Sequence, residues 1–168
     1  MTAVTVRTLI LRELRALKRE IEAYPNEKDL WAVPPGITNS AGTLALHLAG
    51  NLQHFIGARL GGSDYERHRD LEFSRRDVPR TELLQGIDAA IAAVDGTFAR
   101  LTDADLARLY PDELANTKVP TGEFLIHLAV HLGYHLGQVD YHRRIVTGSV
   151  TTLDVVSLKE MPSTFSNA

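Results

Sequence analysis

Three histidines recur at a spacing of four residues in the segment 121–147. His127, His131 and His135 advance by only about 40° around a helix at each step, because an α-helix has 3.6 residues per turn, so they form one stripe. Residues 124–139 carry no formal charge, and a helix that is apolar nearly all round is usually buried. Unpaired polar groups in an apolar interior cost about a few kcal/mol each, so imidazoles there need partners. Neutral imidazole binds zinc, nickel and iron, and the stripe therefore predicts a metal site.

A second stripe of polar side chains is expected on another helix, which begins near residues 39–40 and ends at the glycine pair 61–62. His47, Asn51 and His54 occupy positions i, i+4 and i+7 of this helix and so share one face. Their neighbours are mostly apolar. This stripe is the expected source of a ligand that faces the first one.

Two imidazoles one helical turn apart can share an ion, and a third from a facing helix completes a site with three protein nitrogens. Three protein ligands leave at least one coordination position for water or substrate, which is typical of catalytic metal sites. His131 belongs to both H-x-x-x-H pairs. The spacing leaves open whether His127 or His135 is its partner, and whether His47 or His54 is the third ligand. A hydrogen-bonded pair of core histidines is the alternative without a metal.

The composition restricts the chemistry further. The chain has 168 residues, a net charge of −3 and no cysteine. The charge favours neither nucleic acid nor anionic lipid as a partner, and the absence of cysteine excludes disulfides and thiolate ligands from the protein itself. The longest uncharged run, 30–58, contains two prolines and two histidines and is a poor membrane span. We expect a cytoplasmic protein that binds a small-molecule substrate, with no nucleic acid and no membrane as partners.

The periodicity of apolar residues predicts an all-α protein, a four-helix bundle with long connecting loops. The four helices are expected at 3–24, 40–61, 81–101 and 121–147. Residues 1–148 form the bundle, and residues 149–168 are a C-terminal extension that is packed on the bundle or trails from it. The alanines of 89–94 allow another helix to approach closely, either within the bundle or across a homodimer.

Three other residues and one segment are interpreted as structural. Thr81 is expected to cap the third helix, and the segment 63–80, which mixes both signs of charge, is interpreted as a solvated connection that exposes His68. His142 lies beside two arginines near the end of the last helix, where an imidazolium stabilised by the helix dipole is expected.

The segment HLGYHLGQ, read as H-x-x-x-H-x-G-Q, resembles the DinB/YfiT-like superfamily of proposed metalloenzymes. The stretch ITNSAGTLALHLAGNLQHFIGARLGG, followed by YERHRD and EF, further resembles a DinB-like subgroup of bacterial proteins. The resemblance covers roughly residues 1–148. It implies a four-helix bundle in which His47, His131 and His135 hold a divalent ion, most simply zinc or nickel. Leu136 stands where such proteins often have a basic residue, a departure that touches no ligand.

The resemblance also implies a reaction. The superfamily includes transferases and an isomerase that use low-molecular-weight thiols such as bacillithiol or mycothiol, so thiol transfer to a small electrophilic molecule is the leading expectation. Hydrolysis at the metal is one alternative. The other is a stress-response module without catalysis, in which the ion only joins helices or binds a small molecule.

Five further polar residues are candidates for supporting roles. Gln138, Tyr134 and Asn51 are placed to bond the free N–H of a ligand or a bound water, with simple packing as the alternative. His54 and His127 are expected either to line the pocket around the ion or to be structural.

Overall fold

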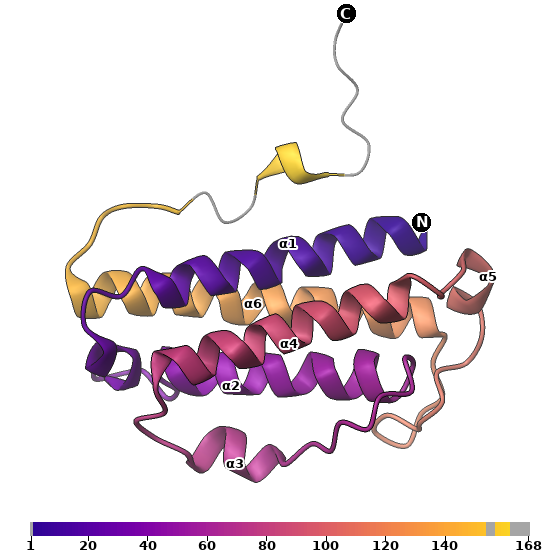
Figure 1. Ribbon diagram of the computed structural model, residues 1–168, viewed down its shortest axis with the longest axis horizontal. Helices are drawn as coiled ribbons and strands as arrows, with labels where there is room; N and C mark the ends of the chain where they lie inside the picture. The colour runs from indigo at the N-terminus through magenta and orange to yellow at the C-terminus, as the bar shows by residue number, and fades with distance from the viewer. Residues whose placement is uncertain (1, 154–156, 162–168) are drawn as a thin grey trace, which may run out of the picture.

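The computed structural model describes residues 2–153 and 157–161, and within them the chain forms a bundle of four long helices (Figure 1). The long helices are α1 (Ala3–Glu22), α2 (Ala41–Leu52), α4 (Arg80–Phe98) and α6 (Thr121–Thr147). Shorter elements connect them: η1 (Glu27–Trp31), η2 (Gln53–Ala58), α3 (Arg69–Ser74), α5 (Asp103–Leu106) and η3 (Leu158–Glu160). In the described residues the only β-type pairing consists of isolated bridges. The expected fold class is confirmed.

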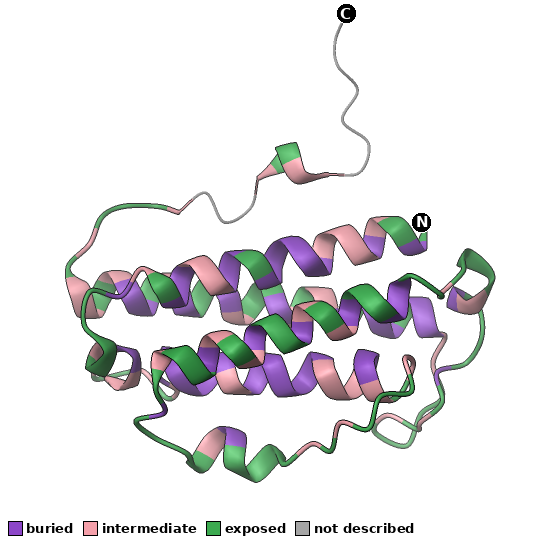
Figure 2. Cartoon of the chain, in the orientation of Figure 1, coloured by how far each residue is buried: buried purple, intermediate pink, exposed green. Residues whose placement is uncertain are grey.

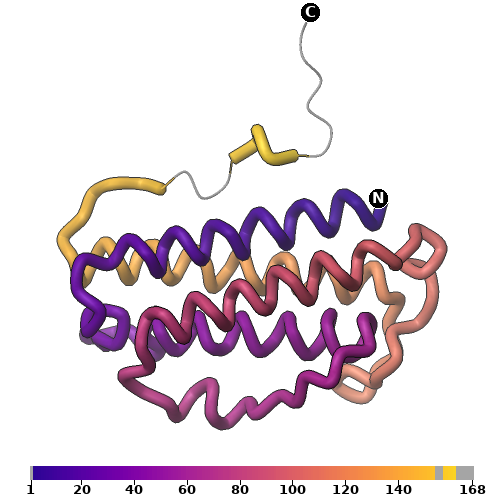
Figure 3. Tube along the Cα trace, in the orientation of Figure 1, coloured from indigo at the N-terminus to yellow at the C-terminus, as the bar shows by residue number. Residues whose placement is uncertain are grey.

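Each long helix packs against two neighbours, because α1 contacts α4 and α6, and α2 also contacts α4 and α6. In the cross-section of the bundle, α1 therefore lies nearly diagonally opposite α2, the next long helix in the chain. α4 and α6 are likewise opposite each other. Figure 3 shows that the connection from α2 to α4 returns along the length of the bundle, so these two neighbours run in the same direction. The long loops expected from the sequence are needed for these crossings.

α2 begins where its capping residue was expected and ends in an unusual way. The Ser40 side chain accepts a hydrogen bond from the Thr43 N–H, which satisfies one of the free amides of the first turn. After Leu52 the helix continues as the π-helical segment η2, in which the Arg59 N–H bonds to the His54 carbonyl at 3.0 Å. Such wide turns inside α-helices occur frequently at functional sites.

α4 begins one residue earlier than predicted. Pro79 occupies the N-cap position and Thr81 lies in the first turn, so the expected capping by Thr81 is wrong. Proline restricts its own φ and favours this boundary without a side-chain bond. Further along, a Cβ added at Gly57 would lie 2.9 Å from the Ala93 Cβ. The small residues of α4 therefore allow close packing against the segment after α2, within the bundle.

α6 has the predicted bounds. It begins at Thr121 after Pro120 and ends at Gly148, whose φ of 69° is left-handed, a conformation that glycine adopts without steric cost. Figure 2 shows buried residues along the inner faces of the long helices, with α2 buried over most of its length. The two helices with the histidine stripes therefore face each other across a closed core.

His142 is not the dipole-stabilised cation expected from its place in the sequence. Its side chain is buried, its Nε2 lies 2.8 Å from the Ala32 carbonyl, and its Nδ1 lies 2.7 Å from the Tyr24 hydroxyl. A neutral ring that donates from Nε2 and accepts at Nδ1 satisfies both bonds. Burial lowers the pKa of His142. The tertiary position of the ring, inside the bundle, decides its charge.

The described part of the C-terminal extension lies near α1. The Arg12 guanidinium donates to the Ser157 carbonyl at 3.4 Å and lies 3.6 Å from the Met161 sulfur. Residues 154–156 and 162–168 lie outside the described residues, so the expectation for the whole extension is not tested there. Within the described residues, no helix combines the length and the hydropathy needed to cross a membrane.

Candidate metal centre

The structure brings three histidines from two helices together. His47 comes from α2 and is buried, and His131 and His135 come from α6 and are half-buried. One nitrogen of each ring lies within 4.8 Å of those of the other two. The Nε2 atoms of His47 and His131 are 3.3 Å apart. This is the set that the resemblance implied, chosen from the five histidines on the two stripes.

The donor set fits a divalent ion. Zinc–nitrogen bonds of about 2.0–2.1 Å with tetrahedral angles place two ligand nitrogens about 3.3–3.4 Å apart, which matches the distance between the His47 and His131 Nε2 atoms. The rings pack edge to face, with the His135 ring at 85° to that of His131 and 89° to that of His47. A metal ion held by three imidazoles would have at least one coordination position left for water or substrate.

Glu72 orients His47 from behind. Its carboxylate lies 3.0 Å from His47 Nδ1 and accepts hydrogen bonds from Arg67 at 2.7 and 2.8 Å. An N–H at Nδ1 donates to this carboxylate and leaves the Nε2 lone pair free for an ion, the usual carboxylate–histidine arrangement at metals. Burial acts to raise the pKa of Glu72, but the hydrogen bonds from Arg67 and His47 outweigh it and lower the pKa. Glu72 is therefore a buried anion.

Gly50 makes room for this carboxylate. A Cβ added at Gly50 would overlap Glu72 Oε1 and would lie 3.0 Å from its Cδ. Glycine is disfavoured in the interior of a helix, and its position here matches the need for a close approach between α2 and α3.

The interpretation of residues 63–80 as a solvated connection is wrong at this point. His68 is exposed as expected, but α3 forms in the middle of the segment and buries Glu72 against α2. The sequence offered a weak signal, since Glu72 stands between Leu71 and Phe73. The mixed charge of the segment concealed that Arg67 and Glu72 pair with each other.

His135 has a partner on its own helix. Its Nδ1 lies 2.6 Å from Gln138 Oε1, so an N–H at Nδ1 donates to the amide oxygen and Nε2 is free. Tyr134 is exposed, with its ring 5.2 Å from that of His135. Gln138 thus orients one candidate ligand, and Tyr134 borders the outer side of the site.

The electrostatics favour neutral imidazoles. Burial is the main cause that lowers the pKa of His131 to about 4, and the neighbouring His135 and His47 lower it further. Burial also lowers the pKa of His135, against the effect of the hydrogen bond that His135 donates to Gln138. Neutral rings near pH 7 keep their lone pairs available to a metal.

The remaining polar residues of the two stripes lie outside the cluster. His54 is half-buried with its ring 4.8 Å from that of Phe55, and burial, Arg67 and Arg59 lower its pKa. His127 is exposed and stacks with His131 at 6.3 Å between ring centroids. Asn51 is buried, and its Oδ1 has no hydrogen-bond partner.

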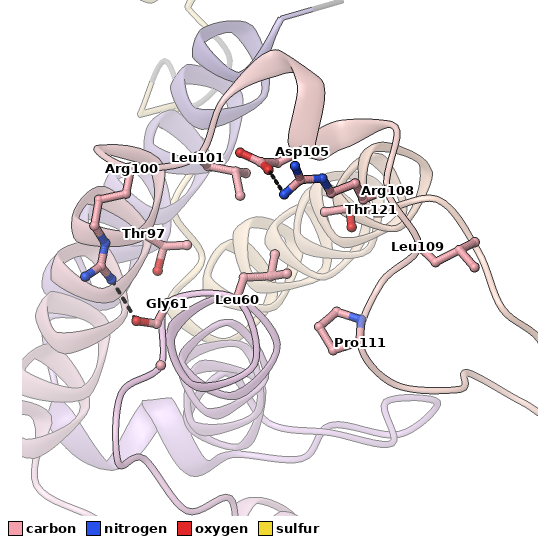
Figure 4. A pocket seen from close by; sticks show the side chains of 11 residues that line it. Leu60, Gly61, Thr97, Arg100, Leu101, Asp105, Arg108, Leu109, Pro111 and Thr121 are labelled. Carbon is pink, nitrogen blue, oxygen red and sulfur yellow. Dashed lines mark hydrogen bonds and ion pairs between the residues drawn. The ribbon is translucent and has the colours of Figure 1, made fainter.

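A hollow of about 430 Å³ lies elsewhere, between the end of η2, α5 and the start of α6, and none of the three histidines lines it (Figure 4). Its two arginines are already bonded: Arg100 donates to the Gly61 carbonyl and Arg108 to Asp105, both at 2.7 Å. The candidate metal centre and this hollow are therefore two separate places in the molecule.

The fold and the site define a class of protein: a four-helix bundle with three histidines that could hold a metal ion between its second and last long helices. The model of the DinB superfamily matches residues 5–139, and the chain belongs to this superfamily. The crystal structure of a DinB-like protein from Bacillus cereus ATCC 10987 is similar, with a TM-score of 0.65 and 17% identity, over 84% of this chain and 90% of that one. No curated protein matches the chain.

Proposed function

We propose that His47, His131 and His135 hold a divalent metal ion, zinc or nickel, and that the protein transfers a low-molecular-weight thiol to a small electrophilic molecule. The observation that carries the proposal is the convergence of three imidazole nitrogens within 4.8 Å of one another. Such a site has vacant coordination positions for a ligand from outside the protein. A bound divalent ion lowers the pKa of a coordinated thiol and stabilises its anion near neutral pH.

The surroundings of the site support thiol transfer over hydrolysis. Hydrolysis needs a general base within hydrogen-bond reach of the attacking water. Glu72 contacts the site, but it accepts hydrogen bonds from Arg67 and His47, and these lower its pKa. A carboxylate that is engaged in this way is a poor base. A thiolate needs no such base once its proton has been lost to the solvent.

The chain's own groups have separate tasks in this proposal. The three histidines bind the ion, while Glu72 and Gln138 hold the rings of His47 and His135 in the required orientation. The buried faces of α2 and α6 exclude water from the inner side of the site. The substrate then approaches from the outer side, where His131 and His135 are half-buried.

The test is turnover by the full-length protein loaded with zinc or nickel. Bacillithiol or mycothiol is incubated with N-methyl chloroacetamide, and chloride release is measured. The sulfur forms a bond to the methylene carbon, chloride leaves with the bonding electrons, and the thiol proton passes to the buffer. Because the chain has no cysteine, the protein contributes no thiol background.

His131→Ala removes one ligand, and His68→Ala is the matched control because His68 is exposed and outside the site. We expect loss of metal content and of rate in the first variant only. Equal rates in His131→Ala and the parent protein contradict the transferase. Metal binding that raises the melting temperature without any turnover supports the non-catalytic role instead.

A further inference from the structure

An apolar recess of about 370 Å³ lies at the start of α6, beside the histidine cluster. It is formed by the loop before α6 and by the first turns of that helix. Its lining consists of Leu114, Ala115, Val119, Glu123, Phe124 and His127. Four of these six side chains are apolar, and Glu123 is the only one with a formal charge at neutral pH.

His127 joins the recess to the candidate metal centre. Its ring stacks on the His131 ring, with 6.3 Å between centroids and 22° between planes, and on the Phe124 ring, with 5.9 Å and 12°. The His127 ring therefore lines the recess and also neighbours the ring of the candidate ligand His131.

The outer wall is a constrained loop. Leu114 and Thr117 exchange two backbone hydrogen bonds of 2.9 Å across a tight turn, in which Ala115 and Asn116 have φ values of 49° and 62°. Non-glycine residues rarely adopt such a conformation, and the two backbone hydrogen bonds across the turn hold it here. The Tyr110 N–H also bonds to the Val119 carbonyl at 2.9 Å. The wall is held in place before any ligand binds.

The floor is aromatic and equally fixed. The Phe124 ring packs edge to face on Phe55 at 5.2 Å and on Tyr110 at 4.6 Å between centroids. The Tyr110 hydroxyl donates to the Phe55 carbonyl at 2.7 Å. Phe124 is only 8% exposed, so the floor presents a small part of this ring, and its aromatic neighbours hold the ring in place.

We propose that this recess binds an apolar, uncharged substituent of the electrophilic substrate, a proposal that rests on the function given above. The apolar lining favours an alkyl or aryl group of moderate size. The Glu123 carboxylate repels a substituent that carries an acid. The substrate class is therefore a small electrophile with a hydrophobic, non-acidic group, and an anionic metabolite does not fit.

The test compares chloroacetamides that share the reacting carbon and differ in the nitrogen substituent. Each reacts by the same balanced substitution, in which the carbon–sulfur bond forms and chloride leaves. We expect kcat/KM for the N-benzyl compound to exceed that for the N-methyl compound by about tenfold or more, the usual scale for filling an apolar pocket. Chloroacetylglycine, which ends in a carboxylate, should be the poorest substrate and should improve in Glu123→Gln.

Leu114→Asp places a charge in the wall, and Leu109→Asp is the matched control because Leu109 is 61% exposed in the same loop and does not line the recess. We expect only the first variant to lose the preference for the benzyl compound over the N-methyl compound. Equal preference in the two variants overturns the proposal.

A binding measurement separates this proposal from the transferase. N-benzylacetamide, which has no leaving group, is titrated into the zinc-loaded parent protein and into both variants, and binding is followed by NMR. Binding that weakens in Leu114→Asp but not in Leu109→Asp supports the recess even if no chloroacetamide reacts. Turnover of all chloroacetamides at one rate, without binding of N-benzylacetamide, overturns the recess and leaves the transferase intact.

Discussion

Removal of the Glu72 carboxylate tests whether a buried anion orients His47 for metal binding. The contact between Glu72 and His47 Nδ1 is 3.0 Å, with only 8% of the His47 side chain and 7% of the Glu72 side chain exposed. Solvent therefore screens the interaction little. Glu72→Gln keeps the size of the side chain and removes its charge, but it also leaves Arg67 without its anionic partner.

The magnitude follows from this geometry. Loss of a group that orients a metal ligand lowers affinity about 10–100-fold, which is about 1.4–2.8 kcal/mol. An uncompensated buried charge at Arg67 would cost about 3–5 kcal/mol of stability by itself. The informative comparison is therefore between the parent protein and the double variant Arg67→Met with Glu72→Gln, which removes both buried charges.

The assay is competition for zinc against a chromophoric chelator, with folding checked by circular dichroism. The double variant should bind zinc about 10–100-fold more weakly than the parent protein. Equal affinities in the double variant and the parent protein would refute the orienting role of Glu72.

Three other predictions concern the fold and its dependence on pH. Arg143 lies 2.6 Å from the buried Glu20, so Arg143→Met leaves this carboxyl group without a partner. The substitution should lower the free energy of unfolding in urea by about 3–5 kcal/mol, and a loss under 1 kcal/mol would contradict the prediction. Tyr24→Phe removes the hydroxyl bonded to His142 at 2.7 Å and should cost about 1–2 kcal/mol, whereas an unchanged denaturation midpoint would argue against that bond. In metal-free protein the pKa of His131 is lowered to about 4, below its value of about 6.5 in an unfolded chain. Between pH 4 and pH 6.5 the unfolded state therefore binds more protons than the folded state. The contribution of His131 to the free energy of unfolding is therefore full above pH 6.5 and is lost as the pH falls to 4. The melting temperature of His131→Leu should fall less steeply over this window than that of the parent, and parallel curves would contradict the assignment.

The local elements of the fold were predictable because their signals are local. The i, i+4 spacing of the histidines and the uncharged run around them indicated the helix α6, and its observed bounds are those expected. Ser40 marked the beginning of α2. The prediction that Thr81 caps α4 was wrong because Pro79, two residues earlier, already restricts the backbone and defines the start of the helix.

The partners of the site residues were not predictable from local pattern. The Arg67–Glu72 pair belongs to a segment whose charges are indistinguishable in sequence from those of a solvated loop, and only the packing of α3 against α2 buries it. The charge of His142 was also not predictable from its neighbours in the sequence. Its neighbours in sequence favour a cation, but its neighbours in space, Tyr24 and the Ala32 carbonyl, favour the neutral ring.

By itself, then, the sequence determined that this protein is a helical bundle with histidine stripes on two of its helices, because periodicity and capping act over a few residues. The tertiary structure decided which histidines meet, which carboxylate supports them and which recess lies beside them. These are contacts between residues such as His47 and His131, far apart in the chain. Their formation depends on how the helices cross and on which charges lose their water, and neither is encoded in any single segment.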